Sequence, residues 1–204
     1  MMAFRLNSLR RNRVLREALS LAMIVLLMLA ARSSLADHYV VPTGSMEHTI
    51  LPGDRVLVDK RAYGLRIPFT TVRIAGQDAR VQRGDIVVFD SPRDGTRLIK
   101  RIVAVGGDRV SLVDGHLQVN GQSLQSQGDV ERFGEKIAQL NLEHGGGADI
   151  RNLDVPDGVL LAIGDHRGNS ADSRVFGFVT ESEVYGKALG IYYRRNEGPV
   201  WQPL

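Results

Sequence analysis

The fold of this chain is limited most by a succession of short apolar segments separated by glycine-containing turns. Its 204 residues include 22 Gly and 7 Pro. Little of the chain places apolar residues at helical spacing, and Asp114-Gly115 is typical of a two-residue hairpin turn. The expected strands cover 55–59, 86–90, 98–105, 109–113, 116–120, 159–163 and 184–193. The sequence therefore predicts a mostly β protein with one main core.

One segment departs from this pattern. Residues 111–157 are more polar and more broken than their flanks, and they contain the flexible run Gly145-Gly146-Gly147. Residues 130–142 have some helical character, so we expect a helix there. We interpret 111–157 as a small subdomain inserted into the β core.

The charge of the chain is concentrated at its N-terminus. The first acidic residue is Glu17, and removing the arginines before it from the 26 basic residues leaves 21 against 23 acidic residues. The remainder is not basic, so we expect no nucleic-acid partner. Cysteine is absent, which excludes disulfides and thiolate catalysis. The N-terminal arginines are Arg5, Arg10, Arg11, Arg13 and Arg16.

An apolar run follows these arginines. Residues 18–31 carry no charge, and extension to Ala36 gives a segment of roughly 30 Å as a helix. Because basic residues are enriched on the cytoplasmic side, we expect a cytoplasmic tail over 1–16, a transmembrane anchor over 17–36 and an extracytoplasmic domain over 37–204. A cleaved secretory signal, with small residues at Ser34 and Ala36, is the alternative.

The first candidate site is the turn Val41-Pro42-Thr43-Gly44-Ser45-Met46. Gly44 permits a sharp turn and close approach by a ligand. Ser45 can then present both its hydroxyl and its own N–H, and the hydroxyl of Thr43 can point to the same side. Two donors that converge on one point form an oxyanion hole. An ordinary polar turn is the alternative interpretation.

The second candidate is Lys100, on the strand expected over 98–105. Side chains alternate along a strand, so Lys100 shares a face with the apolar Leu98 and Ile102, whereas Arg101 points to the other face. Burial against such a surface lowers the pKa of a lysine, and a neutral lysine can take the proton of a serine hydroxyl. An exposed lysine that protects a sheet edge is the alternative.

The third candidate is the polar segment 164–174, which holds two acids, two arginines and two serines directly after an apolar strand. A solvated surface loop is the alternative. A calcium-binding EF-hand loop does not fit, because Phe176 occupies the position of the required glutamate. His48, three residues after Ser45, is an alternative catalytic base, and no spacing of histidines supports a metal site.

Together and in this order, the three segments resemble the motifs of bacterial type I signal peptidases, over about residues 16–193. The matching residues are Val41-Pro42-Thr43-Gly44-Ser45-Met46 with Leu51-Pro52-Gly53-Asp54, Ile99-Lys100-Arg101-Ile102-Val103 with Gly107-Asp108, and Gly164-Asp165-x-Arg167-x-Asn169-Ser170-x-Asp172-Ser173-Arg174. The resemblance implies a signal-peptidase-like β catalytic core with a small inserted subdomain, preceded by one N-terminal transmembrane helix.

The resemblance also implies roles for individual residues. Ser45 would be the nucleophile and Lys100 the general base, with the Ser45 N–H and the Thr43 hydroxyl as the oxyanion hole. Ser170 would hydrogen-bond to Lys100 and orient it. Asp172 and Arg174 would form a supporting ion pair.

The implied activity is a membrane-anchored serine endopeptidase that removes signal peptides from exported preproteins at the bacterial cytoplasmic (inner) membrane. Its partners would be those signal peptides and the lipid bilayer, and it would need no metal or cofactor. Shallow pockets for small substrate side chains would be lined by Val41, Met46, Ile50 and Ile99. A dedicated peptidase for one pilin or conjugation substrate, and a non-catalytic membrane-tethered β binding module, are the alternatives.

Some positions depart from the family pattern. Glu47-His48 stands where the family usually has a residue followed by proline, and Gly106-Gly107 replaces a more usual Pro-Gly. His166 replaces a common asparagine, and Thr43 replaces serine or glycine while keeping a hydroxyl donor.

Overall fold

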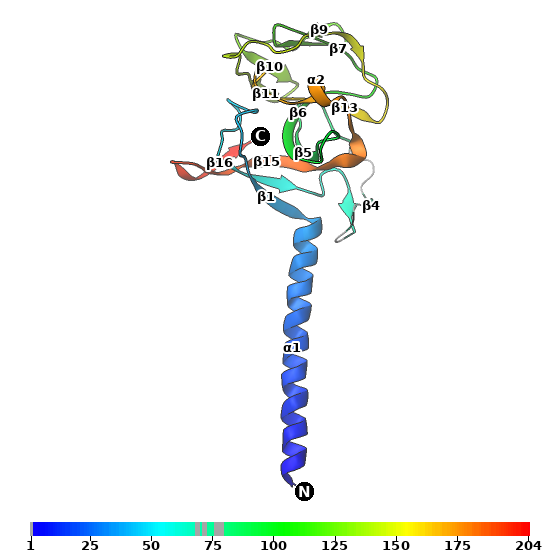
Figure 1. Ribbon diagram of the computed structural model, residues 1–204, viewed down its shortest axis with the longest axis vertical. Helices are drawn as coiled ribbons and strands as arrows, with labels where there is room; N and C mark the ends of the chain where they lie inside the picture. The colour runs from blue at the N-terminus through cyan, green and yellow to red at the C-terminus, as the bar shows by residue number, and fades with distance from the viewer. Residues whose placement is uncertain (1, 68–69, 71–72, 76–79) are drawn as a thin grey trace.

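The computed structural model describes residues 2–67, 70, 73–75 and 80–204 of the chain. Figure 1 shows a β-rich domain from which one long helix projects, with the N-terminus at its far end. The domain is built almost entirely from short strands, as the sequence predicts. Among its described residues, the helical segments are α2 (Ser173–Phe176) and a 3₁₀ turn, η1 (Glu181–Glu183).

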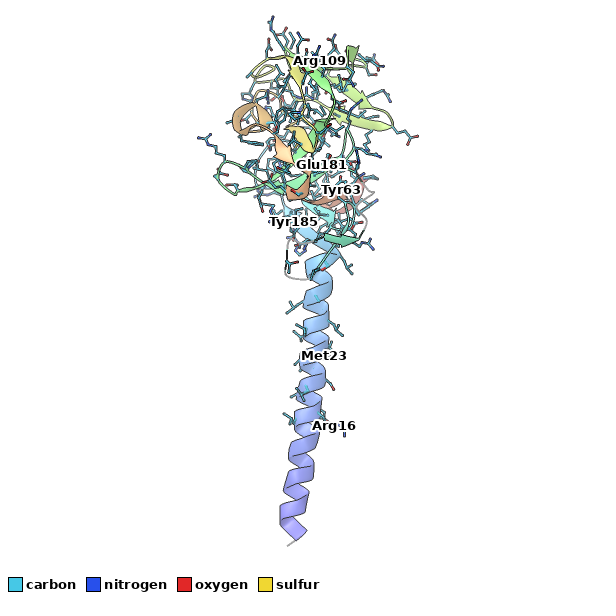
Figure 2. The ribbon with its side chains drawn as sticks, turned by 90° about the vertical axis from the view of Figure 1, so that its right-hand side faces the viewer. Arg16, Met23, Tyr63, Arg109, Glu181 and Tyr185 are labelled. Atoms are coloured by element: carbon cyan, nitrogen blue, oxygen red, sulfur yellow. The ribbon has the colours of Figure 1, made fainter. Side chains whose placement is uncertain are left out.

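The projecting helix is α1 (Met2–Ser34). Figure 2 shows Met23 on the outside of this helix, away from the β domain, and its side chain is 56% exposed. The helix ends at Ser34, within the segment 17–36 expected as the anchor, and Ala36 begins β1. Among the described residues, no helix combines the length and the apolar character that crossing a membrane requires.

The main sheet has eight strands in the order β1-β2-β15-β5-β6-β13-β14, with β16 paired to β15. Every neighbouring pair is antiparallel. The strands are β1 (Ala36–Val40), β2 (Arg55–Asp59), β5 (Ile86–Asp90), β6 (Arg97–Val105), β13 (Val159–Ile163), β14 (Val179–Thr180), β15 (Val184–Arg194) and β16 (Gly198–Pro203). The strands expected over 55–59, 86–90 and 159–163 are confirmed residue for residue, and those over 98–105 and 184–193 to within one residue.

The chain between β6 and β13 forms separate sheets (Figure 1). Four strands pair in the order β12-β7-β8-β9, and β10 pairs with β11 as a hairpin. These strands are β7 (Arg109–Val113), β8 (His116–Val119), β9 (Gln122–Ser123), β10 (Val130–Phe133), β11 (Lys136–Gln139) and β12 (Ile150–Asp154). A further small hairpin earlier in the chain joins β3 (Leu65–Arg66) to β4 (Arg73–Ala75).

The helix expected over 130–142 is wrong, because β10 and β11 occupy this segment. Side chains of β10 alternate between inside and outside, so that Glu131 and Phe133 are buried. Gly134, with φ of 67°, lies in the turn between the two strands. Helix propensity is weak, and here the burial of alternate side chains overrides it.

The core is divided among three groups of apolar side chains. One group packs Val56 and Val58 of β2 against Ile191 of β15. It includes Met46, the residue that follows Ser45 in the sequence. Another lies on the face of β6 that carries Ile102. The third joins the main sheet to β7 and β8. The turn that contains Ser45 and the strand β6 are therefore anchored in well-packed surroundings.

Candidate functional site

Ser45 lies in the turn that follows β1. Val41 N–H donates to Asp54 O at 2.9 Å, Gly53 N–H donates to Val41 O at 2.7 Å, and Glu47 N–H donates to Gly44 O at 3.1 Å. These bonds hold both ends of the turn against the chain that leads into β2. Ser45 itself is 8% exposed. Ser45 is thus nearly, but not completely, closed off from solvent.

Lys100 meets Ser45 across a sequence separation of 55 residues. The Lys100 Nζ lies 2.6 Å from Ser45 Oγ and 3.1 Å from the carbonyl oxygen of Ile99. On the sheet Lys100 pairs with the fully buried Val87 of β5. Lys100 is 2% exposed, so it is not the exposed edge residue of the alternative interpretation.

Burial sets the protonation of this lysine. Desolvation lowers the pKa of Lys100 from 10.5 to about 8, although the negative charges of Asp172 and Asp165 act in the opposite direction. A substantial fraction of the amine is therefore neutral slightly above neutral pH. A neutral amine within hydrogen-bond reach of a serine hydroxyl has the geometry and the basicity of a general base.

The hydroxyl of Thr43 lies on the same side of the turn as the hydroxyl of Ser45. Thr43 Oγ1 is 3.5 Å from Ser45 Oγ, at the limit of a hydrogen bond. A donor at this position is close to the atom that would attack a substrate carbonyl. Thr43 is therefore a candidate donor beside the Ser45 hydroxyl.

Ser170 lies beside the pair but does not make the expected bond to Lys100. Its Oγ is buried and has no hydrogen-bond partner among the described residues. It packs against Gly164, where a Cβ atom would collide with both the Ser170 hydroxyl and the Ser45 carbonyl oxygen. Glycine at position 164 is therefore what allows the third motif to approach Ser45.

Asp172 and Arg174 form the supporting ion pair expected from the motif. Arg174 Nη2 lies 2.8 Å from Asp172 Oδ2, and the Asp172 carboxylate also accepts the Gly164 N–H at 3.0 Å. The same carboxylate caps α2 by accepting the N–H of Arg174. Asp172 thus ties the end of β13 to α2, next to Lys100.

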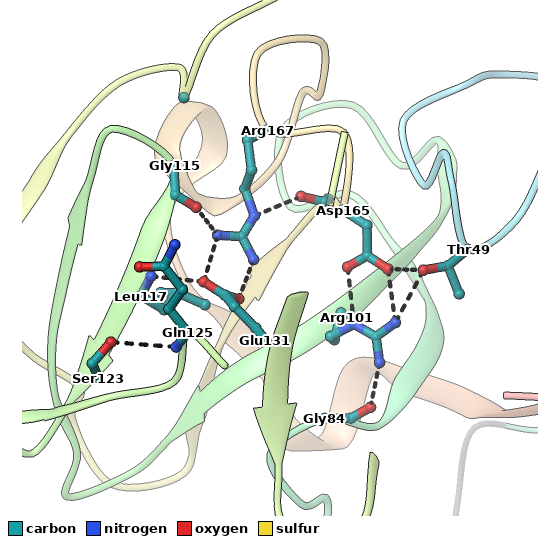
Figure 3. Close-up of polar contacts among 12 residues, drawn as sticks. Thr49, Gly84, Arg101, Gly115, Leu117, Ser123, Gln125, Glu131, Asp165 and Arg167 are labelled. Atoms are coloured by element: carbon teal, nitrogen blue, oxygen red, sulfur yellow. Dashed lines mark hydrogen bonds and ion pairs between the residues drawn. The ribbon is translucent and has the colours of Figure 1, made fainter. Parts of the chain in front are cut away.

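A second buried ion pair was not anticipated from the sequence. Arg101 donates to both carboxylate oxygens of Asp165, at 2.9 and 2.7 Å, and its remaining nitrogen donates to Gly84 O at 3.0 Å (Figure 3). Thr49 Oγ1 also donates to Asp165. Arg101 joins the strand of Lys100 to the third motif. The signal was present, because a charged Arg101 alternates with apolar residues on a buried strand.

Arg167 forms a third buried pair, with Glu131 of β10. Arg167 Nη2 lies 2.6 Å from Glu131 Oε2, and Arg167 also donates to the carbonyl oxygens of Gly115 and Gly164 (Figure 3). Glu131 accepts the N–H of Leu117 at 2.7 Å as well. This network attaches the segment between β6 and β13 to the third motif. No local sequence pattern could indicate it.

The alternative base, His48, has a different partner. Its Nδ1 lies 3.2 Å from the carbonyl oxygen of Leu140. The described residues contain no group of three or more His, Cys, Asp or Glu side chains arranged to hold a metal ion. Of the groups considered as a base, it is Lys100 that the structure brings to Ser45.

The four residues expected to line substrate pockets do not share one environment. Val41, Met46 and Ile50 are at most 2% exposed and belong to the core, whereas Ile99 is only partly buried against it. Ile99 is next to Lys100, and its carbonyl oxygen accepts a bond from that lysine. Of the four, Ile99 is therefore the one whose side chain is partly exposed.

Comparison with known proteins gives a consistent result. The family described as "Signal peptidase, peptidase S26" matches residues 14–193. The signal peptidases I of Pseudomonas fluorescens and Pseudomonas aeruginosa are 31% and 30% identical to the chain, and each alignment covers 83% of this chain and 69% of the relative. A crystal structure of a signal peptidase I from Enterococcus faecalis is 32% identical, covers 53% of this chain and 96% of that one, and has a TM-score of 0.39. The chain therefore belongs to the signal peptidase family, peptidase S26, and is a serine endopeptidase of the signal peptidase I type.

Proposed function

We propose that this chain removes signal peptides from exported precursor proteins, with Ser45 as the nucleophile and Lys100 as the general base. The observation that carries the proposal is the 2.6 Å contact between Lys100 Nζ and Ser45 Oγ at a nearly closed site. The lowered pKa of Lys100 supports it, because only a neutral amine can accept the hydroxyl proton.

The chemistry follows from this contact. Neutral Lys100 takes the proton of Ser45 as Oγ attacks the carbonyl carbon of the scissile peptide bond. The resulting ammonium then protonates the leaving amine, which departs as the new N-terminus of the mature protein. A water molecule gives its proton to Lys100 and attacks the acyl-enzyme ester, which releases the signal peptide and restores the Ser45 hydroxyl.

The negative charge that develops on the carbonyl oxygen needs two donors. In this proposal they are the N–H of Ser45 and the hydroxyl of Thr43, which lies 3.5 Å from Ser45 Oγ. Ser170 and the Asp172–Arg174 pair support the lysine. The unpartnered Ser170 hydroxyl is free to accept a hydrogen bond from the Lys100 ammonium once it has formed.

The proposal also covers a substrate pocket beside the pair and the division of the chain into domains. Ile99 contributes to a shallow pocket for a small substrate side chain, because it is the partly exposed apolar neighbour of Lys100. Residues 37–204 form the catalytic domain, and 111–157 form its inserted subdomain. The separate pairing of β7 to β12 supports that division.

We further propose that α1 attaches the domain to the cytoplasmic membrane, with 1–16 in the cytoplasm and the catalytic domain outside. Consecutive apolar side chains from Met23 to Leu29 are each 46–65% exposed, so the helix presents apolar surface on every side. Burial of this surface in lipid is favourable. It would also hold the active site close to a substrate whose own apolar segment lies in the membrane.

The experiment compares cleavage of a precursor protein by wild type, Ser45→Ala and Lys100→Met, with Ser123→Ala on the exposed β9 as the matched control. Folding of each variant is checked by circular dichroism. We expect loss of at least about 10³-fold in turnover for the first two variants and none for the control. Near-normal turnover by either Ser45→Ala or Lys100→Met contradicts the proposed pair.

A further inference from the structure

A buried histidine lies behind the nucleophile turn, outside the pair that carries the chemistry. The side chain of His166 is 3% exposed. Its Nδ1 lies 3.1 Å from the carbonyl oxygen of Gly44 and 3.1 Å from Glu47 Oε2, and its Nε2 lies 3.0 Å from Nδ1 of the exposed His144. Both ring nitrogens are therefore in contact with polar partners, and one partner belongs to the peptide group that precedes Ser45.

These contacts determine which ring nitrogen carries a proton. A carbonyl oxygen and an ionised carboxylate can only accept hydrogen bonds, so Nδ1 of His166 is the donor to both Gly44 and Glu47. With the ring neutral, Nε2 is then an acceptor and Nδ1 of His144 donates to it. Glu47 therefore helps to keep the proton of His166 on the nitrogen that faces Gly44.

The carbonyl of Gly44 and the N–H of Ser45 belong to the same planar peptide group. A hydrogen bond to this carbonyl therefore fixes the direction of the N–H and, through polarisation of the amide, makes it a stronger donor. The carbonyl also accepts the Glu47 N–H at 3.1 Å, and the backbone N–H of His166 donates to Ser45 O at 3.2 Å. The peptide groups on both sides of the Ser45 Cα are thus bonded to His166.

We propose that His166 is a positioning residue that orients and polarises the Gly44–Ser45 peptide, so that the Ser45 N–H can hold the oxyanion of the reaction. This inference rests on the proposed function, because that function requires the Ser45 N–H as an oxyanion donor. The contacts of His166 explain what orients this N–H. His166 does not touch the substrate in this account. It acts through the backbone of the nucleophile.

The side chain of Glu47 has a defined place in this arrangement. A Cβ atom at Gly44 would lie 2.7 Å from the carboxyl carbon of Glu47, so the carboxylate packs directly over the glycine. Glycine at this position lets the carboxylate reach Nδ1 of His166. His144 has a smaller role, since it satisfies Nε2 from an exposed position where water can replace it.

The test uses a matched pair of amide side chains. The amide nitrogen of asparagine falls close to the place of Nδ1 of histidine, whereas that of glutamine falls closer to the place of Nε2. We expect His166→Asn to retain kcat within about threefold, and His166→Gln and His166→Ala to lower kcat by roughly tenfold to hundredfold with little change in KM. His116→Ala, on β8, is the control histidine, for which no change in kcat is expected.

A second measurement separates orientation of the oxyanion donor from general loosening of the site. A peptide aldehyde forms a hemiacetal with the serine and places its oxygen in the oxyanion hole, whereas the product peptide acid binds without this bond. In His166→Gln, the inhibition constant of the aldehyde should rise by the same factor as kcat/KM falls. The inhibition constant of the product peptide should stay unchanged.

The outcomes are distinct. Equal kcat for His166→Asn, His166→Gln and wild type overturns the positioning role, and so does an equal loss of affinity for aldehyde and product peptide. If His166→Ala does not fold, the asparagine and glutamine variants decide the question. Full turnover by Ser45→Ala instead contradicts the proposed function itself, and with it the need for an oxyanion donor at Ser45.

Discussion

Lys100 and Arg101 are consecutive basic residues on β6 whose charged groups have opposite surroundings. Lys100 Nζ lies 2.6 Å from the neutral hydroxyl of Ser45, whereas Arg101 donates two hydrogen bonds to the carboxylate of Asp165. Both side chains are almost fully buried. A buried charge is tolerated when it is paired, and an unpaired amine shifts its pKa instead. The strand thus holds Arg101 as a paired cation and lowers the pKa of Lys100, the residue proposed as the general base.

The pH dependence of acylation should report the pKa of Lys100. The reaction requires the neutral amine, and burial lowers this pKa to about 8. The rate of single-turnover acylation should therefore rise with pH and reach half of its maximum near pH 8. A midpoint near the ordinary lysine value of 10.5 would show that the amine is solvated.

Removal of the charge of Asp172 should move this midpoint to lower pH. The carboxylate of Asp172 favours the charged form of Lys100, so its neutralisation leaves the desolvation effect less opposed. Asp172→Asn keeps the shape of the side chain and is the variant to compare. The control is Asp154→Asn, which removes an exposed charge on β12 and should leave the midpoint of the acylation rate unchanged. A shift of the midpoint to higher pH in Asp172→Asn contradicts the assigned effect of Asp172 on the pKa of Lys100.

Lys100→Met should stabilise the protein while it abolishes activity. At pH 7 the wild-type lysine must either carry a charge in a desolvated site or give up a proton, and its pKa shift corresponds to a cost of up to about 3 kcal/mol. The folded protein binds fewer protons than the unfolded chain between pH 8 and 10.5, so wild-type stability should rise with pH across this window. Urea unfolding at pH 7 and at pH 10.5 measures both effects. The advantage of the methionine variant should shrink at the higher pH.

Loss of Arg101 should destabilise the fold strongly. Arg101→Met leaves the Asp165 carboxylate buried without its cation, which costs about 3–5 kcal/mol in the free energy of unfolding. Arg109→Met, which breaks the exposed pair with Asp154, is the matched control and should change stability little. The double variant Arg101→Met with Asp165→Leu should recover part of the loss. Equal effects of the two single arginine variants would mean that burial of the Arg101 pair has no energetic consequence.

Gly164→Ala should lower both activity and stability. The added Cβ would collide with the Ser170 hydroxyl and with the carbonyl oxygen of Ser45, so the third motif must move away from the nucleophile. Overpacking of this kind costs about 1–3 kcal/mol. Gly95→Ala, in a turn where nothing lies within 4 Å of the new Cβ, is the comparison without a collision, and its only cost is the backbone strain of a φ of 71°. Wild-type turnover by Gly164→Ala would show that activity does not need the close approach of the third motif to Ser45.

The strands and the candidate residues were accessible from the sequence because their signals are local. Alternation of apolar residues and glycine turns located β2, β5 and β13, and the apolar neighbours of Lys100 indicated its burial. The wrong helix over 130–142 shows the limit of such signals. There, burial of Glu131 against Arg167 selects strand geometry, and those two residues are separated by 36 positions.

The sequence by itself determined the mostly β character and the order of the motifs, and it indicated Ser45 and Lys100 as the candidate pair, since each depends on periodicity or residue type over a few positions. Only the tertiary structure decided that Lys100 reaches Ser45, that Arg101 and Arg167 are buried with partners, that Ser170 lacks the expected bond and that His166 lies behind the nucleophile. These contacts join segments far apart in the chain, and their distances follow from sheet pairing and side-chain packing. No local pattern encodes a distance between such segments.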